Sequence, residues 1–269
     1  MEAGLAHPIF DAVRPWLQRL GDPSLERLNQ LAGEADVRTE SGRPVRFVPP
    51  GQSDAYYEVR VYESGCVATR PQSRHDLFNA LAWLAFPRTK ARINALHARE
   101  IPRERGRRGR KRDLLTLLDE GGALVQCADA ELIGMLRGFR WKALFWEQRA
   151  RVLRDMRFLV LGHAILEQAL HPWPGIACKA VFVAPDEDPD AAAAQWLERL
   201  PPEATPQEMA PLPVFGYPGW YPGNERGEFY DDTRYFRPFR RVKSQPGAGR
   251  AAAAPCAEES PGSAERDAG

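Results

Sequence analysis

The densest run of apolar side chains lies between residues 74 and 86. From Leu77 onward, leucine, phenylalanine, tryptophan and alanine occupy nearly every position of this run. A helix that is hydrophobic on all faces is normally buried on all sides. Pro87 then ends this helix or begins a second one, because proline is tolerated at the first helical position and not in the helix interior. The pattern predicts a buried helix followed by a second helix from Pro87.

The polar side chains of the first helix are confined to its first turns. They are His75, Asp76 and Asn79, and His75 and Asn79 share a face because they are four residues apart. Ser73-x-x-Asp76 also has the form of a helix-capping pair, in which Asp76 would only satisfy backbone donors. The cluster is therefore either one wall of a polar cleft or a helix cap.

The second helix carries two stripes at helical spacing. Ile93 and Leu96 belong to an apolar stripe, while Lys90, Asn94 and His97 form a polar one. The polar stripe and the polar tip of the first helix could line a common cleft. The alternative is that the polar stripe is an ordinary solvated face.

Nearer the amino end, amphipathic patterns over residues 8–20 and 24–35 predict two helices joined at residues 21–23. They would form an N-terminal helical hairpin within residues 1–36. Over Tyr56–Tyr62, β-branched and aromatic residues recur with period two, which predicts a strand.

The middle of the chain suggests a β-hairpin. Apolar residues 114–118 and 123–127 flank the acid-glycine sequence Asp119-Glu120-Gly121-Gly122, which is typical of a turn. Asp129 is then placed to cap a helix that ends near Arg137, and residues 141–152 continue as a basic and aromatic helix.

A strand, a helix and a strand are expected over residues 157–161, 162–170 and 178–183, and together they predict one βαβ unit. His163 would lie at the strand-to-helix junction, where ligands bind in such units. The helix dipole favours a neutral histidine there, which suits a metal ligand or a base. Glu167 follows four residues later on the same face. The alternative is a histidine bonded to a neighbouring loop and a glutamate in a surface ion pair.

Residues 212–238 are rich in proline, glycine and aromatic side chains and have no period of their own. We expect a strap across the domain surface that could wall the cleft with rings such as that of Trp220. From about residue 242 the chain is rich in Gly, Ala, Ser and Pro, which predicts a disordered tail over 242–269. The predicted fold is therefore α+β: a single domain over residues 1–241, with helices packed on a mixed sheet.

Composition narrows the class of protein. An apolar fraction of 43% among 269 residues is ample for a core, and a net charge of +1 makes no general case for nucleic acid or membrane binding. Cys66, Cys127, Cys178 and Cys256 contain no Cys-x-x-Cys pair, which argues against a zinc knuckle or a disulfide framework. We see no secretory signal and no apolar run near the roughly 18 residues of a membrane span. These features predict a cytoplasmic protein.

One segment is locally basic. Residues 99–112 contain seven arginines and one lysine against Glu100 and Glu104. Such a patch could contact phosphates, together with the arginine-rich helix near residues 141–157. No aromatic residue is interleaved for base stacking, which favours a solvated loop instead.

The polar residues set among apolar ones are the candidates for chemistry, because burying such groups is costly unless they pair or hold a cation. Histidines and carboxylates in one site would suit a divalent metal that activates water, although the spacing identifies no particular metal. Without a metal, a His–Asp pair could act as acid or base while a cationic side chain holds an anionic substrate. The candidate catalytic residues are His75, Asp76, Asn79, Asp119, Glu120, His163 and Glu167. The candidate substrate-binding residues are Arg70, Arg88, Lys90, Asn94 and Trp220.

Several ordered motifs between about residues 40 and 240 resemble a bacterial family known only as domain of unknown function 3025. They include Tyr57-Glu58-x-Arg60-Val61, His75-Asp76-x-Phe78-Asn79-Ala80-Leu81-x-Trp83-Leu84-x-Phe86-Pro87, Gly162-His163-Ala164-x-Leu166-Glu167 and Pro213-Val214-x-Gly216-x-Pro218-Gly219-Trp220. The resemblance implies kinship and carries no known activity.

Three functions therefore stay open. The first is a hydrolase-like or ligand-binding protein that takes a small or anionic molecule in a polar cleft. The second is a nucleic-acid-binding module that uses residues 99–112. The third is a non-enzymatic interaction protein that docks through the aromatic strap. The sequence predicts no oligomeric state.

Overall fold

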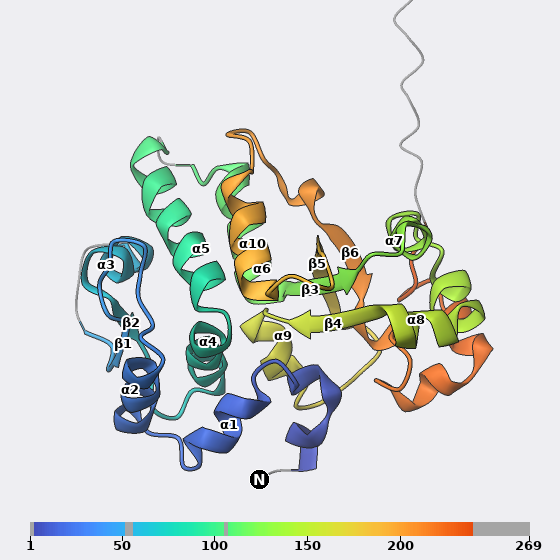
Figure 1. Cartoon of the computed structure of the whole chain (residues 1–269), viewed down its shortest axis with the longest axis horizontal. Coiled ribbons are helices and arrows are strands. Elements are labelled where there is room, and N and C mark those ends of the chain that lie inside the picture. Colours follow the sequence, from blue (N-terminus) through green and yellow to red (C-terminus); the bar gives the residue numbers. More distant parts are fainter. Residues whose placement is uncertain (1–2, 52–55, 105–106, 239–269) are drawn as a thin grey trace, which may run out of the picture. The chain divides into compact units, whose positions relative to one another are not determined.

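A computed structural model of the chain describes residues 3–51, 56–104 and 107–238. At its centre lies a mixed four-stranded sheet (Figure 1). The strand order is β4-β3-β5-β6, with β3 antiparallel to β4 and parallel to β5, and β5 antiparallel to β6. The strands are β3 (Gly122–Cys127), β4 (Met156–Val160), β5 (Ala177–Val183) and β6 (Ala210–Pro213). The predicted single α+β domain with a mixed sheet is confirmed.

The central strand β3 is buried at all six positions, because both faces of the sheet are covered. Ala123 and Val125 join the larger apolar core on one face. Leu124 belongs to a second core, on the other face, with side chains of α6 (Arg110–Gly121) and α10 (Pro189–Glu198). A strand covered on both faces is mostly apolar, which explains the composition of β3. Its polar residue Gln126 donates to the carbonyl oxygen of Glu187 at 3.3 Å.

The helices α4 (Arg74–Ala85) and α5 (Pro87–Glu100) confirm the predicted break at Pro87, which is the first residue of α5. The hydroxyl Oγ of Ser73 accepts a hydrogen bond from the backbone N of Asp76 at 3.2 Å and so caps α4. Apolar side chains of α4, such as Phe78 and Leu81, are buried as expected for a helix that is hydrophobic on most faces.

A second, parallel sheet pairs β1 (Arg46–Val48) with β2 (Cys66–Ala68). The predicted strand over residues 56–62 is wrong, because most of this segment forms the helix α3 (Tyr57–Ser64) between those two strands. Parallel neighbours require a crossover connection, so the tertiary pairing outweighs the local β propensity. Gly65, with φ of +74°, ends α3 and turns the chain into β2.

The predicted β-hairpin is wrong in its first half, because residues 114–118 lie inside α6 and only β3 is a strand. Leu114, Leu115 and Leu118 face the second core, whereas Leu117 is exposed, which is a helical and not an alternating pattern. Gly122 permits a direct turn from α6 into β3, because a Cβ atom there would lie 2.3 Å from the carbonyl oxygen of Leu118.

The βαβ unit is at a different place from the one predicted. β4 and β5 flank β3 on opposite sides and run antiparallel to each other, so β4, α9 (His163–Gln168) and β5 do not form such a unit. The parallel pair with a crossover helix is instead β1-α3-β2. β3 lies between β4 and β5, which the prediction had placed together in one βαβ unit.

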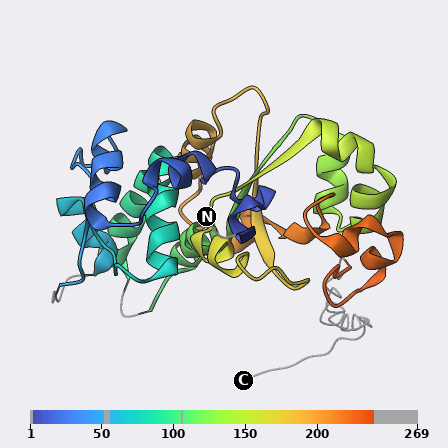
Figure 2. The same cartoon turned by 90° about the horizontal axis from the view of Figure 1, so that it is seen from below.

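The remaining elements cover the two sheets. They are α1 (Arg14–Leu20), α2 (Leu25–Glu34), α7 (Ala130–Arg137), a π-helical turn (Ala143–Glu147), α8 (Arg149–Asp155) and short 3₁₀ turns. Asp129 caps α7 as predicted, since its Oδ1 accepts from the backbone N of Glu131 at 3.0 Å. In two views at right angles, α4 and α5 lie between the four-stranded sheet and the group formed by α3, β1 and β2 (Figures 1 and 2).

The aromatic strap is largely interior, and not a cover on the surface as predicted. Its rings Phe215, Tyr217, Trp220 and Tyr230 are all buried in the larger core. The predicted disordered tail over 242–269 lies outside the described residues. Among the helices that the structure describes, none is long and apolar enough to cross a membrane.

Candidate metal centre and its cavity

A cavity of about 540 Å³ opens between α3, α4, α5, α6 and the start of α9. Nine of the twelve predicted site residues line it, from segments far apart in the sequence. The nine are Arg70, His75, Asp76, Asn79, Lys90, Asn94, Asp119, Glu120 and His163. These nine residues therefore line one cavity, and their catalytic and binding roles stay predictions.

His163 is the first residue of α9 and its side chain is buried. Its ring atom Nδ1 lies 2.8 Å from the backbone carbonyl oxygen of Asp119. A carbonyl oxygen can only accept, so Nδ1 carries the proton and Nε2 keeps a lone pair. The preceding residue must be glycine, because a Cβ atom on Gly162 would lie 2.6 Å from the carbonyl oxygen of Glu120. Close backbone contact thus places His163 beside the end of α6.

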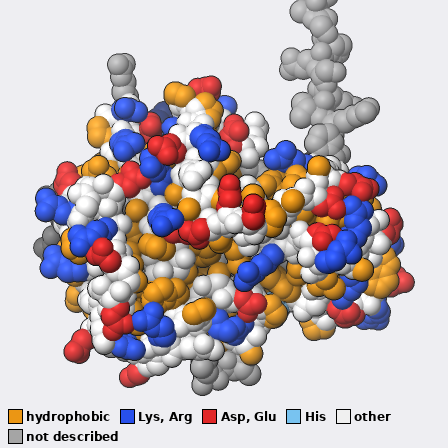
Figure 3. Space-filling model, viewed as in Figure 1, with side chains coloured by type: hydrophobic (Ala, Val, Ile, Leu, Met, Phe, Trp, Pro, Cys, Tyr) orange, Lys and Arg blue, Asp and Glu red, His pale blue; other side chains and the backbone are white. Residues whose placement is uncertain are grey.

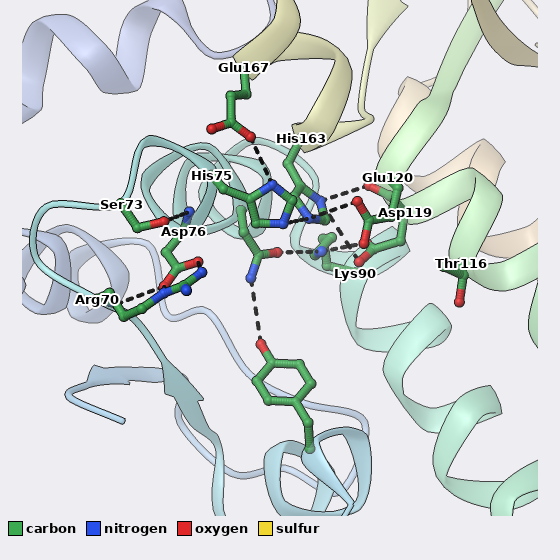
Figure 4. A network of polar contacts seen from close by, with 12 residues as sticks. Arg70, Ser73, His75, Asp76, Lys90, Thr116, Asp119, Glu120, His163 and Glu167 are labelled. Carbon is green, nitrogen blue, oxygen red and sulfur yellow. Dashed lines mark hydrogen bonds and ion pairs between the residues drawn. The ribbon is translucent and has the colours of Figure 1, made fainter. Parts of the chain in front are cut away.

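His75 in the first turn of α4 has the same arrangement. Its Nδ1 lies 3.0 Å from Oε2 of Glu167, a carboxylate on α9 that can accept this proton. Figure 4 shows the His75 ring between Glu167 and His163. The two Nε2 atoms are 3.2 Å apart. If both rings are neutral, two lone pairs face each other, which is unfavourable unless a proton or a metal ion lies between them.

Glu120 completes a possible ligand set. Its Oε2 lies 3.8 Å from Nε2 of His163, and one ligand atom from each of His75, Glu120 and His163 lies within 4.8 Å of the others. Two imidazole nitrogens bound to one tetrahedral zinc ion at about 2.0–2.1 Å stand about 3.3–3.4 Å apart. The observed 3.2 Å between the histidines is close to that separation. This triad could hold a metal ion.

The partners of the two Nδ1 atoms also suit a metal site. Metal-binding histidines usually donate their second ring N–H to a carboxylate or a backbone carbonyl, which fixes the tautomer and the ring orientation. Glu167 has this role for His75, and the carbonyl of Asp119 has it for His163. Glu167 itself does not line the cavity, so the structure places it behind His75.

Electrostatics keep His163 neutral. Burial lowers its pKa to about 4, although Asp119 acts in the opposite direction. Near pH 7 the lone pair on Nε2 is therefore available to a cation. Neutral imidazole is also the form that binds metals.

Lys90 and Asp119 form a buried ion pair beside the triad. The Lys90 ammonium donates to Oδ1 of Asp119 and, at 2.7 Å, to Oδ1 of Asn79, and it lies 5.6 Å from the centre of the Trp83 ring. Burial opposes ionisation of Asp119, but the charge of Lys90 and its hydrogen bond outweigh this, and the pKa of Asp119 is lowered. Asp119 is thus a fixed carboxylate whose orientation depends on Lys90.

Asp76 belongs to a separate ion pair at the cavity edge. Nε and NH2 of Arg70 donate to its two carboxylate oxygens, each at 2.8 Å, and the backbone N of Arg70 donates as well. These bonds lower the pKa of Asp76 to about 2, so the carboxyl stays ionised. Figure 4 shows this pair apart from the histidines. This ion pair therefore connects the segment that follows β2 to α4, and it is separate from the triad.

Two predicted substrate-binding residues are not in the cavity. Arg88 at the start of α5 contacts α10, where its backbone N donates to Asp190 and its NH1 donates to Asp188 at 3.2 Å. Trp220 is buried in the strap, and its carbonyl oxygen lies 2.6 Å from Nε2 of His7. The structure brings neither side chain to the triad.

The cavity is also lined by residues absent from the predicted set, among them Tyr57, His97, Arg108 and Thr116. His97 was recognisable as the third member of the stripe with Lys90 and Asn94. The others were hidden because their segments were interpreted as strand, flexible loop and strand. For Tyr57 and Thr116 the helical periodicity of α3 and α6 carried the missing signal, whereas Arg108 lies in the loop before α6.

Several arginines of the basic segment are paired with acidic neighbours. Arg103 pairs with Glu100 at 3.3 Å, Arg108 with Asp113 at 2.9 Å, and Arg112 with Glu104 at 2.8 Å; residues 105–106 lie outside the described part. On the face drawn in Figure 3, basic and acidic side chains are interspersed. No observation here favours a phosphate-binding surface over an ion-paired one.

Comparison with known proteins identifies a family but no function. A family model described as "Protein of unknown function (DUF3025)" matches residues 45–240. No curated protein and no solved structure matches the chain.

Proposed function

The chain belongs to the DUF3025 family, and we propose that it is a divalent-metal-dependent hydrolase whose ion is held by His75, Glu120 and His163. One observation carries the proposal. The Nε2 atoms of the two histidines face each other at 3.2 Å while each Nδ1 is engaged by an acceptor. A cation between them removes the conflict, and the carboxylate of Glu120 is close enough to join it.

The chemistry follows from the ligand set. His75, Glu120 and His163 would hold the ion, and a divalent ion there would supply Lewis-acid chemistry that activates water and polarises a carbonyl group. In this proposal Asp119, kept ionised by Lys90, is the candidate base that takes a proton from the attacking water. The cavity provides the volume for an organic substrate next to these groups.

Metal binding is the direct test. We expect the purified full chain to bind about one Zn²⁺ or similar ion, and His163→Ala to weaken that binding at least about 100-fold, because a ligand and not a supporting group is lost. Calorimetric titration and elemental analysis measure both. His171→Ala is the matched control, since His171 is an exposed histidine away from the cavity.

A hydrolase assay completes the test. Metal-loaded protein should cleave members of a panel of ester, amide and phosphoester substrates, and chelation should abolish that cleavage. Wild-type protein that binds no divalent ion under any condition would overturn the proposal.

The same 3.2 Å contact supports a second candidate. If His75 is protonated, its Nε2–H donates to Nε2 of His163 while Glu167 stabilises the positive charge, and the pair could act in acid–base chemistry without metal. ¹⁵N NMR distinguishes the two cases. A protonated His75 Nε2 in metal-saturated protein would favour the metal-free candidate.

A further inference from the structure

A second polar group lies in the same cavity and takes no part in the triad. Asn94 and His97 are three residues apart on α5, so their side chains are neighbours on one face of the helix. Both line the cavity, and both are more than nine-tenths buried. Apolar side chains of Val61 and Ile93 line the cavity as well.

Asn94 has an acceptor without a donor. Its Nδ2 donates to the carbonyl oxygen of Glu58 at 2.8 Å, and this fixes the orientation of the amide because a carbonyl can only accept. Oδ1 therefore points elsewhere, and no described atom donates to it. A buried acceptor without a partner is destabilising, so such groups are rare without a reason.

His97 has a donor without an acceptor. Nε of Arg112 donates to Nδ1 of His97 at 3.3 Å, and because a guanidinium has no lone pair, Nδ1 must be the unprotonated nitrogen. Burial lowers the pKa of His97, so the ring is neutral near pH 7 and carries its proton on Nε2. Within the described residues, Nε2 has no acceptor.

We infer that Asn94 and His97 form a subsite for a ligand edge on which N–H and C=O stand side by side, as in a primary carboxamide or a lactam. The ligand N–H donates to Oδ1 of Asn94, and its C=O accepts from Nε2 of His97. A trans secondary amide fits less well, because its N–H and C=O point in opposite directions while both protein groups lie on one helix face.

The position of this subsite defines a substrate class. Asn94 and His97 follow Lys90 by four and seven residues, which corresponds to about 6–10 Å along the axis of a helix. Lys90 contacts Asp119 beside the triad. If the proposed hydrolase function holds, the substrate therefore carries its carboxamide or lactam apart from the bond that is cleaved, further along α5. Binding of the amide edge itself requires no metal.

Benzamide and acetophenone provide the test, because they differ only in NH₂ against CH₃ and neither is readily hydrolysed. With the full chain, we expect benzamide to bind at least about 5-fold more tightly, the ratio expected for one hydrogen bond. It should also shift the NMR signals of the Asn94 side-chain amide and the His97 ring. Equal or tighter binding of acetophenone, or shifts confined to other residues, would overturn the inference.

Variants assign the effect to the subsite. Asn94→Leu should reduce the benzamide to acetophenone ratio to about 1. Thr116→Val is the control, since Thr116 lines the same cavity but its hydroxyl already accepts from Arg108, and it should keep the ratio of the wild type. If Asn94→Leu does not fold, the ratio of benzamide to acetophenone affinity measured with the wild type still tests the inference.

On the same sample, a titration with Zn²⁺ is followed through the NMR signals of the His75 and His163 rings. Loss of the metal site and loss of the amide subsite are therefore observed separately.

Discussion

Two buried asparagines show how the cavity differs from the strap. Asn224 in the strap is fully buried; its Nδ2 donates to the carbonyls of Phe215 and Tyr217, and its Oδ1 accepts from the backbone N of Gly219. Asn94 in the cavity is buried almost as deeply but makes one side-chain hydrogen bond, to the carbonyl of Glu58. The strap satisfies its polar atoms internally, and the cavity does not.

The same contrast holds for the rings of the two regions. Tyr217 and Tyr235 are buried, and their hydroxyls donate to the carbonyls of Met156 at 2.7 Å and Ile176 at 2.8 Å. In the cavity, the Nε2 atoms of His75 and His163 instead face each other at 3.2 Å, and two neutral rings would direct lone pairs at each other. Buried polar groups that are fully paired stabilise a fold, whereas groups left unpaired in a cavity indicate a ligand. The strap therefore has a structural role, and the cavity is the candidate site.

The largest expected effect is on stability. Asn224→Leu leaves the carbonyl of Phe215 and the backbone N–H of Gly219 without partners, whereas the carbonyl of Tyr217 still accepts from the backbone N of Trp220. The free energy of unfolding should fall by about 2–3 kcal/mol, at roughly 1 kcal/mol or more for each unpaired group. Asn94→Leu loses one hydrogen bond and also removes the unpaired acceptor, so about 1 kcal/mol or less is expected. Urea denaturation measures both. Equal losses of unfolding free energy in the two variants would contradict the proposed difference between the strap and the cavity.

The next effect concerns metal affinity. Glu167→Gln weakens the acceptor that orients His75 and should reduce Zn²⁺ affinity by about 10–100-fold, with little change in stability because the carboxylate is partly exposed. Calorimetric titration measures it. Glu198→Gln, at an exposed ion pair, is the control. If Glu167→Gln binds Zn²⁺ like the wild type, Glu167 is only a surface partner of His75.

The smallest effect is on the pH dependence of stability. The pKa of His163 is lowered to about 4 from 6.5, mainly by burial. Between these values the unfolded chain binds more protons than the folded one, so the free energy of unfolding falls as pH falls, by about 1.4 kcal/mol per pH unit. The stability contributed by the neutral His163 ring is complete above pH 6.5. Urea titrations with a chelator present should give His163→Gln a shallower slope between pH 6 and 5; an unchanged slope would contradict the burial of a neutral ring.

The sequence was sufficient to predict the parts of the site that depend on local rules. The apolar run before Pro87 predicted α4 and α5, and these helices carry His75 and Lys90. A glycine followed by a histidine after a strand predicted the position of His163 at the start of α9. Capping, proline and periodicity act within a few residues, so they can be recognised in one sequence.

Long-range pairing could not be predicted in the same way. Residues 114–118 fit a buried strand as well as a buried helix until the facing core is known, since short apolar runs carry no clear period. The segment over residues 56–62 has β-forming residues, but the parallel pairing of β1 and β2 requires a helix there. Both errors concealed that Thr116 and Tyr57 face the cavity.

Gly162 has a consequence for the choice of ion. Backbone, and not side chains, sets the spacing between the segments that carry Glu120 and His163, because Gly162 lies against the carbonyl of Glu120 with no room for a methyl group. Rotamer changes can adjust a ligand atom, but they cannot bring these two main chains nearer or move them apart. In the proposed metal site, this fixed backbone spacing would limit the range of cation radii that the ligands accept. One added carbon at residue 162 would shift that preference toward larger ions.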